Sequence, residues 1–105
     1  MFYEIRREKA MPGRGDALAQ WMDEQVIPLH EAAGMTVVGA FTDAFDADAF
    51  VWIRRFGSEE ERAEIVDRVH RDPAFEADVV PRLADLVAGE AVTVRLVPTA
   101  HSKLS

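Results

Sequence analysis

Apolar alternation, together with runs of β-branched and aromatic residues, predicts four β-strands. They are residues 2–9, 35–42, 50–56 and 91–97. In residues 2–9 (FYEIRREK) successive side chains would point to opposite faces of a sheet, as the two-residue period of a strand requires. A polar tract at residues 43–49 (DAFDADA) separates the second strand from the third. We therefore expect these two strands to form a hairpin.

A first helix is predicted between the first two strands. Asp16 follows a glycine- and proline-containing turn and is expected to cap the helix. Pro28 removes a backbone donor and should kink the helix late, and Gly34 is a natural terminator. The apolar residues that recur at helical spacing are Leu18, Trp21, Met22, Val26 and Leu29.

A second helical region precedes the last strand. Ser58 and Glu61 form a capping box, and Asp72 with Pro73 marks the start of a further helix. A break is expected at Pro81, and an end at Gly89. The predicted inner positions are Ile65, Val66 and Val69, followed by Phe75, Val79, Leu83, Leu86 and Val87.

The predicted order of elements is strand, helix, strand, strand, helix, strand. This is the split βαβ pattern of ferredoxin-like folds. At 105 residues the chain has the usual size of a single domain. We therefore predict an α+β, ferredoxin-like βαββαβ domain with a four-stranded antiparallel sheet over residues 1–97, followed by a flexible C-terminal tail at residues 98–105.

The two faces of the predicted sheet differ in composition, and this difference predicts a dimer. The face assigned to the helices carries Tyr3, Ile5, Val51, Ile53, Val92, Val94 and Leu96. The opposite face carries Phe50, Trp52, Arg54 and Phe56, with Phe2 and Phe41 in position to join them. Such an exposed aromatic patch is unusual on a monomer, so we expect the same face of a second copy to cover it. The alternatives are that the faces are reversed or that the tail covers the patch.

Composition narrows the classes of partner. Hydrophobic residues make up 49% and charged residues 30% of the chain, as in ordinary globular proteins. The net charge of −7 disfavours nucleic acid, and no apolar stretch approaches the roughly 20 residues that span a membrane. A strand that begins at Phe2 leaves no room for a signal peptide, and the chain has no cysteine. We expect a cytoplasmic protein without disulfides.

Arginines in the strands suggest a ligand site on the aromatic face. Arg6 and Arg54 would converge there with Trp52 and Phe41. A guanidinium in a partly dry, aromatic cavity is a good receptor for a carboxylate or an enolate oxygen. Glu4 shares this face, either as a catalytic base or as the partner of Arg54 or Arg6 in a structural ion pair that holds the dimer together.

His30 is the candidate acid or base among the three histidines. It follows Pro28 near the end of the first predicted helix, where it could exchange protons near neutral pH or hydrogen-bond carbonyls of its own helix. His70 and His101 are expected at the surface. No histidine pair or carboxylate cluster has metal-ligand spacing, so we predict no metal and no cofactor, although a single histidine would suffice for haem.

Several short motifs, taken in order, resemble the NIPSNAP family. They are Tyr3-Glu4-Ile5-Arg6, Met11-Pro12-Gly13, Pro28-Leu29-His30-Glu31 leading to Gly34-Met35, Val37-Val38-Gly39 with Phe41, Ser58 to Arg62, and Asp72-Pro73-Ala74-Phe75. The family often has tryptophan at the position of Phe75. The resemblance implies a dimeric α+β barrel in which two ferredoxin-like sheets face each other. Its superfamily includes cofactor-free monooxygenases, isomerases, haem-degrading enzymes and stress-response proteins, so no single activity transfers.

Two functional hypotheses follow. In the first, a homodimer binds a small planar or carboxylated organic molecule on the sheet face, and an enzymatic form would act without a cofactor as a monooxygenase or isomerase. In the second, dimerisation consumes the aromatic face of a non-catalytic interaction or stress-response module that has no ligand. A cavity of ligand size separates the two hypotheses.

Overall fold

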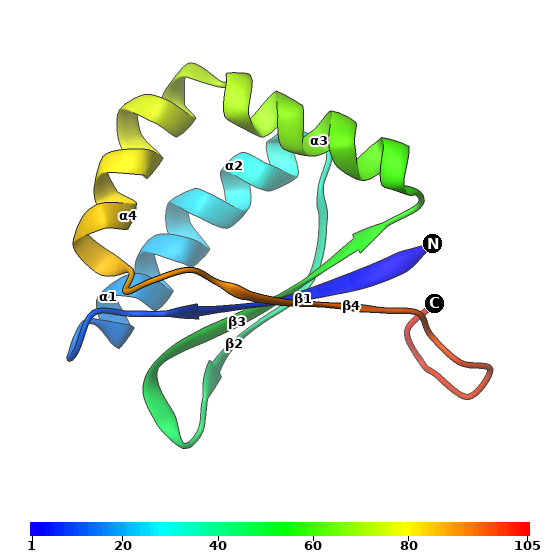
Figure 1. Ribbon diagram of the computed structural model, residues 1–105, viewed down its shortest axis with the longest axis horizontal. Helices are drawn as coiled ribbons and strands as arrows, with labels where there is room; N and C mark the ends of the chain where they lie inside the picture. The colour runs from blue at the N-terminus through cyan, green and yellow to red at the C-terminus, as the bar shows by residue number, and fades with distance from the viewer.

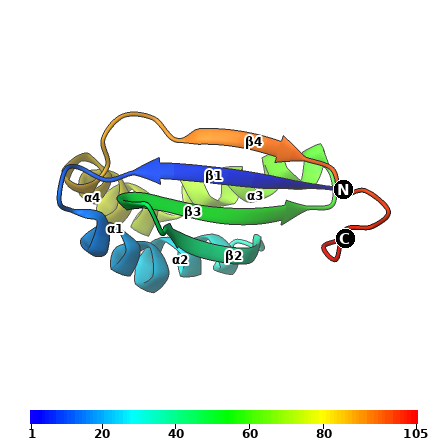
Figure 2. The same ribbon diagram turned by 90° about the horizontal axis from the view of Figure 1, so that it is seen from below.

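Four antiparallel strands form a single sheet in the order β2-β3-β1-β4. The computed structural model describes all residues, 1–105. The strands are β1 (Phe2–Lys9), β2 (Thr36–Asp43), β3 (Asp46–Phe56) and β4 (Val92–Leu96). β1 lies between β3 and β4 (Figure 2), with Glu4 opposite Arg54 on one side and Arg95 on the other. The predicted antiparallel α+β fold is confirmed.

All helices cover one face of the sheet (Figures 1 and 2). Between β1 and β2 the chain forms α1 (Gly15–Trp21), η1 (Met22–Val26) and α2 (Ile27–Ala32). Between β3 and β4 it forms α3 (Glu59–Arg71), η2 (Phe75–Val79) and α4 (Val80–Leu86). No helix is long and apolar enough to cross a membrane.

Both late prolines sit directly after a π-helical turn. Pro28 follows η1 in the first turn of α2, and Pro81 follows η2 in the first turn of α4. A proline cannot donate to the carbonyl four residues earlier and its ring clashes with that group, and the wider π turn accommodates both effects. The predicted break at Pro81 is therefore a local widening within a continuous helical segment.

The predicted capping box at the start of α3 is present. The Glu61 amide donates to Ser58 Oγ over 3.1 Å, and the Glu61 carboxylate accepts from the Gly57 amide over 2.8 Å. The predicted cap of the first helix is wrong, because α1 begins at Gly15 and Asp16 lies inside it. Asp48 supplies the acceptors instead, taking hydrogen bonds from the amides of Gly13 and Gly15.

The predicted assignment of the two sheet faces is wrong. The aromatic and charged set points toward the helices and is buried, namely Phe2, Glu4, Phe50, Trp52, Arg54 and Phe56. The aliphatic set lies on the bare face, where Val92, Val94 and Leu96 are exposed. Alternation shows which residues share a face, but it does not show which face meets the helices. Large rings fill the space under the helices, and opposite charges neutralise each other there.

The tail covers part of the bare face. Residues 98–105 form no helix or strand, and they turn back toward the end of the sheet near the N-terminus (Figure 1). Pro98 and Leu104 line an apolar pocket of about 280 Å³ together with Tyr3, Ile5 and Ile53. Tyr3 is thereby only 5% exposed, while the β4 side chains beyond it remain accessible.

Candidate functional site

A cavity of about 270 Å³ lies between the sheet and the helices. We call it the inner cavity. β1 and β3 supply its floor with the side chains of Arg6, Glu8, Trp52 and Arg54. The walls come from η1, α2, α3, η2 and α4, and they are mostly apolar apart from His30, Arg62 and His70.

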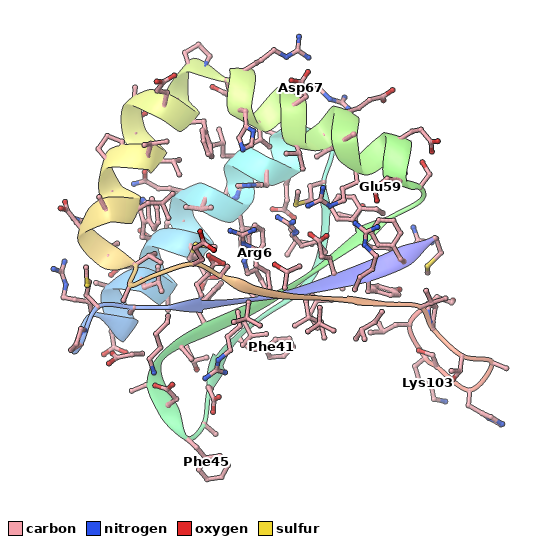
Figure 3. The ribbon with its side chains drawn as sticks, in the orientation of Figure 1. Arg6, Phe41, Phe45, Glu59, Asp67 and Lys103 are labelled. Atoms are coloured by element: carbon pink, nitrogen blue, oxygen red, sulfur yellow. The ribbon has the colours of Figure 1, made fainter.

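The structure brings together most of the predicted site residues. Arg6, His30, Trp52 and Arg54 all line the inner cavity. Glu4 lies beside it as a partner of Arg54. Phe41 points to the opposite face of the sheet (Figure 3), where it is 53% exposed. The predicted grouping of Phe41 with Trp52 and the arginines is therefore wrong, because β2 pairs with β3 in a register that places Phe41 beside Val51.

Glu4 is the acceptor at the centre of an arginine cluster. It is 2% exposed and accepts hydrogen bonds from Arg54 and from Arg62 Nε, the latter over 2.9 Å. Arg95 lies 3.6 Å away. Burial alone would raise the pKa of Glu4, but Arg54 and Arg62 together outweigh it and hold the pKa below its usual value. Glu4 is thus an ionised partner that holds arginines beside the cavity, and its ion pair with Arg54 lies inside one copy of the chain rather than at a dimer interface.

His30 is held in one tautomer by its own helix. Its Nδ1 lies 2.7 Å from the carbonyl oxygen of Val26, and an imidazole nitrogen that meets a carbonyl must carry a hydrogen. In the neutral ring Nε2 therefore keeps its lone pair. Burial lowers the pKa of His30, and the charges of Arg54, Arg6 and His70 lower it further against the opposing bond to Val26. Both predicted readings of His30 are compatible, since the helical hydrogen bond leaves Nε2 available as a base.

Trp52 is packed between a cation and the imidazole. The Arg54 guanidinium carbon lies 4.9 Å from the centre of the Trp52 ring, and the His30 ring meets it edge-on at 5.2 Å between centroids. Two buried donors of this group, Trp52 Nε1 and Arg54 Nε, have no hydrogen-bond partner. Unpaired buried donors are rare in native structures and typically cost about 1–3 kcal/mol. The packing around Trp52 therefore leaves two buried polar atoms unsatisfied beside the cavity.

Sequence reasoning missed three polar residues of the cavity. Glu8 shares the strand face of Glu4 and Arg6, so the two-residue period of the strand could have identified it. Arg62 and His70 come from α3, and no sequence pattern shows which helix side chains reach a given point on a sheet. No three histidine, aspartate or glutamate side chains come together in an arrangement that could hold a metal ion.

The family comparison agrees with this architecture. The model of the NIPSNAP family matches residues 3–103. The chain belongs to the NIPSNAP family. No curated protein sequence matches it.

Solved NIPSNAP structures share the fold along the whole chain. A NIPSNAP family protein with unknown function from Agrobacterium tumefaciens is 27% identical, with a TM-score of 0.88 over 100% of this chain and 94% of that one. An uncharacterized NIPSNAP domain protein from Burkholderia xenovorans is 19% identical, with a TM-score of 0.84 over 97% and 98% of the two chains. A structure described as an antibiotic biosynthesis monooxygenase is 17% identical, with a TM-score of 0.65 over 94% and 99%. The fold of this NIPSNAP protein is therefore related to monooxygenase-like folds.

Proposed function

We propose that this NIPSNAP-family protein binds a small planar organic acid in the inner cavity and transfers a proton on it without a cofactor. The observation that carries the proposal is His30, a buried imidazole with its Nδ1 bonded to Val26 and its pKa lowered mainly by burial. At neutral pH such a group is an uncharged base. It sits in a cavity that also contains Trp52, Arg54 and Arg6.

The surrounding groups suit the charge that proton removal creates. If His30 Nε2 takes a proton from a carbon next to a carbonyl, the electron pair moves to the carbonyl oxygen and forms an enolate. The arginines that line the cavity are donors of the kind that stabilise such an oxyanion. Return of the proton to a different atom completes a tautomerisation. A volume of about 270 Å³ is near the lower end of ligand pockets, typically about 300–1,000 Å³, and favours a single-ring ligand.

Phenylpyruvate is a suitable probe because it combines a planar ring, a carboxylate and an exchangeable benzylic C–H group. We expect the protein to accelerate deuterium uptake at the benzylic carbon in heavy water, followed by proton NMR. His30→Asn is expected to remove the acceleration while phenylpyruvate still binds, since the asparagine amide can replace Nδ1 but not Nε2. His101→Asn, which changes an exposed histidine in the tail, is the matched control.

The possible outcomes separate binding from catalysis. Binding without accelerated exchange would remove the enzymatic part of the proposal and leave a binding protein. Exchange that persists in His30→Asn would assign the base to another residue. Absence of both binding and exchange for phenylpyruvate and simpler aromatic acids would contradict the proposed function.

We also propose that the bare sheet face is covered by a second copy of this chain. Its exposed aliphatic side chains, Val92, Val94 and Leu96, lie with Phe41 on the face that no helix covers, and a two-fold axis would bring equivalent faces together. The inner cavity lies on the opposite side of the sheet, so dimerisation does not consume it. The non-catalytic dimerisation module, the alternative function, therefore no longer competes with ligand binding for one surface. A cytoplasmic location is part of the same proposal.

A further inference from the structure

Arg6 lies where two hollows of the molecule meet. Besides the inner cavity, a cleft of about 510 Å³ opens between β1, the end of α4 and the connection to β4. We call it the outer cleft. Arg6, Glu8 and Leu83 line both hollows, and Figure 3 shows Arg6 in the space between the sheet and the helices. The outer cleft thus adjoins the inner cavity, and the two hollows share these three side chains.

Arg6 is also a cavity arginine with uncommitted donors, and unlike Arg62, which likewise donates only through Nε, it lines the outer cleft as well. Arg54 and Arg62 both donate to Glu4. Arg6 donates only through Nε, over 2.8 Å to Glu8, and its two terminal nitrogens make no hydrogen bond within the protein. Its side chain is 36% exposed, which leaves the guanidinium reachable. The edge formed by two terminal nitrogens matches a carboxylate with two parallel hydrogen bonds.

Glu8 is a buried carboxylate whose single ionic partner is Arg6. It is 5% exposed, and it fixes one edge of the guanidinium through Nε. Its negative charge also repels a second carboxylate that approaches the other edge of Arg6. Glu8 therefore has two opposing effects on an anionic ligand: it orients the receptor and it weakens the attraction.

We propose that Arg6 recognises the carboxylate of a ligand that enters through the outer cleft, and that Glu8 positions Arg6 while its charge limits the affinity. This inference rests on the proposed function and names the ligand class as a planar monocarboxylate. The carboxylate sits at the junction of the two hollows, and the ring extends toward Trp52 in the inner cavity.

Benzoate and its uncharged analogue benzamide test this assignment directly. Their dissociation constants would be measured by calorimetric titration for the wild type, Glu8→Gln, Arg6→Gln and Arg6→Lys. Glutamine at position 8 keeps an acceptor for Arg6 Nε and removes the charge, so benzoate should bind about threefold to tenfold more tightly. Arg6→Gln should weaken the binding of benzoate at least about tenfold. The affinity of Arg6→Lys should lie between those of the wild type and Arg6→Gln, because lysine keeps the positive charge but cannot form two parallel hydrogen bonds.

Two controls identify the cause of any change. Glu60→Gln removes one negative charge from an exposed position of α3 and should leave benzoate binding unchanged. Benzamide should bind all variants alike, which also shows that each variant retains the cavity. If benzoate binds the wild type but is insensitive to both Arg6 and Glu8, the inference is overturned and the proposed function stands. If neither compound binds the wild type, both are contradicted.

Discussion

At the scale of single residues, His30 is the group to which the proposed function assigns proton transfer in the cavity. Its Nδ1–H is held by the Val26 carbonyl at 2.7 Å, and burial lowers the pKa of the ring. The neutral form is therefore favoured in the folded protein, with Nε2 as an acceptor. A histidine of ordinary pKa, about 6.5, would be partly protonated near neutrality and a poorer base.

The lowered pKa of His30 predicts a loss of stability in mild acid. As pH falls below about 6.5, the ordinary value, the unfolded chain takes up this proton more readily than the folded protein, so the free energy of unfolding decreases. The loss is complete once pH passes below the depressed folded pKa. We expect His30→Asn to lose less stability than the wild type between about pH 7.5 and pH 5.5, measured by urea unfolding at each pH.

The groups that face His30 could also affect this dependence on pH, so the experiment needs a control. His70 lines the same cavity, and Arg54 and Arg6 act on His30 through their charges. His101→Asn in the exposed tail should keep the wild-type dependence on pH. An unchanged dependence in His30→Asn would mean that burial does not depress the pKa of His30.

Glu4 predicts a stability effect of a different kind. Glu4→Gln leaves the nearly buried Arg54 without its carboxylate, and breaking a buried ion pair from one side typically costs about 3–5 kcal/mol. Arg62 and Arg95 are more exposed, so losing the carboxylate costs them less than it costs Arg54. We therefore expect Glu4→Gln to lower the free energy of unfolding by about 2–4 kcal/mol, measured by urea unfolding. Glu59→Gln, which removes the exposed partner of Arg95, should cost about 0.5 kcal/mol or less. Equal effects would contradict the central role assigned to Glu4.

The sequence predicts which residues share a face of the sheet more readily than it predicts which face meets the helices. The two-residue period correctly placed Glu4, Arg6, Trp52 and Arg54 on one face. It could not show that this face meets the helices, because alternation is symmetric about the sheet. Charged residues usually face solvent, and only the long-range pairing of Glu4 with Arg54 and Arg62 makes their burial tolerable.

At the scale of elements, the start of α1 depends on close contact with the start of β3. Asp48 accepts hydrogen bonds from the amides of Gly13 and Gly15. A Cβ atom at Gly15 would lie 1.7 Å from the backbone oxygen of Ala47. Only a movement of the backbone could relieve this clash. α1 leads directly into η1, which supplies the first wall of the inner cavity, so this contact anchors the segment that carries that wall.

This contact predicts that Gly15→Ala is strongly destabilising. We expect a loss of about 2 kcal/mol or more, because overpacking against backbone forces the two elements apart. Gly57→Ala is the matched control, since its Cβ would meet only the movable carboxylate of Glu61 and should cost about 1 kcal/mol or less. Urea unfolding of the two variants gives the comparison. A mild effect at Gly15 would mean that the junction is not tightly packed.

Local signals were sufficient for most elements, and non-local ones were missed. The capping box at Ser58 and the terminating Gly34 are short-range features, and the structure confirms both. The cap that Asp48 provides to α1 spans more than thirty residues of sequence, beyond any capping motif. The π turns before Pro28 and Pro81 arise where tertiary packing keeps a helix continuous through a proline.

At the scale of the whole molecule, the sheet separates two surfaces to which we assign different proposed tasks. The helix-covered face encloses the inner cavity, and the bare face presents aliphatic side chains. A dimer built on the bare face would leave the outer cleft and the inner cavity of each copy intact. In the proposed arrangement, ligand binding and self-association would be independent of each other.

The proposed dimer predicts that a charge on the bare face will dissociate it. Val94 is 47% exposed on β4, and Val94→Asp would bury a carboxylate between two copies. We expect a dimer for the wild type and a monomer for Val94→Asp by size-exclusion chromatography with light scattering. Val80→Asp makes the same change at a similarly exposed valine of α4 and should remain dimeric. A monomeric wild type would contradict the proposal.

The most direct test of ligand binding in the inner cavity uses the two tryptophans. The chain has only Trp21 and Trp52, so a nitrogen–proton NMR spectrum contains two indole signals, which Trp52→Phe assigns. Trp52 lines the inner cavity with an unpartnered Nε1, whereas Trp21 does not line it. Titration with benzoate is predicted to shift the Trp52 signal in a saturable way and to leave the Trp21 signal in place. If neither signal moves, or both move alike, the inner cavity is not the binding site.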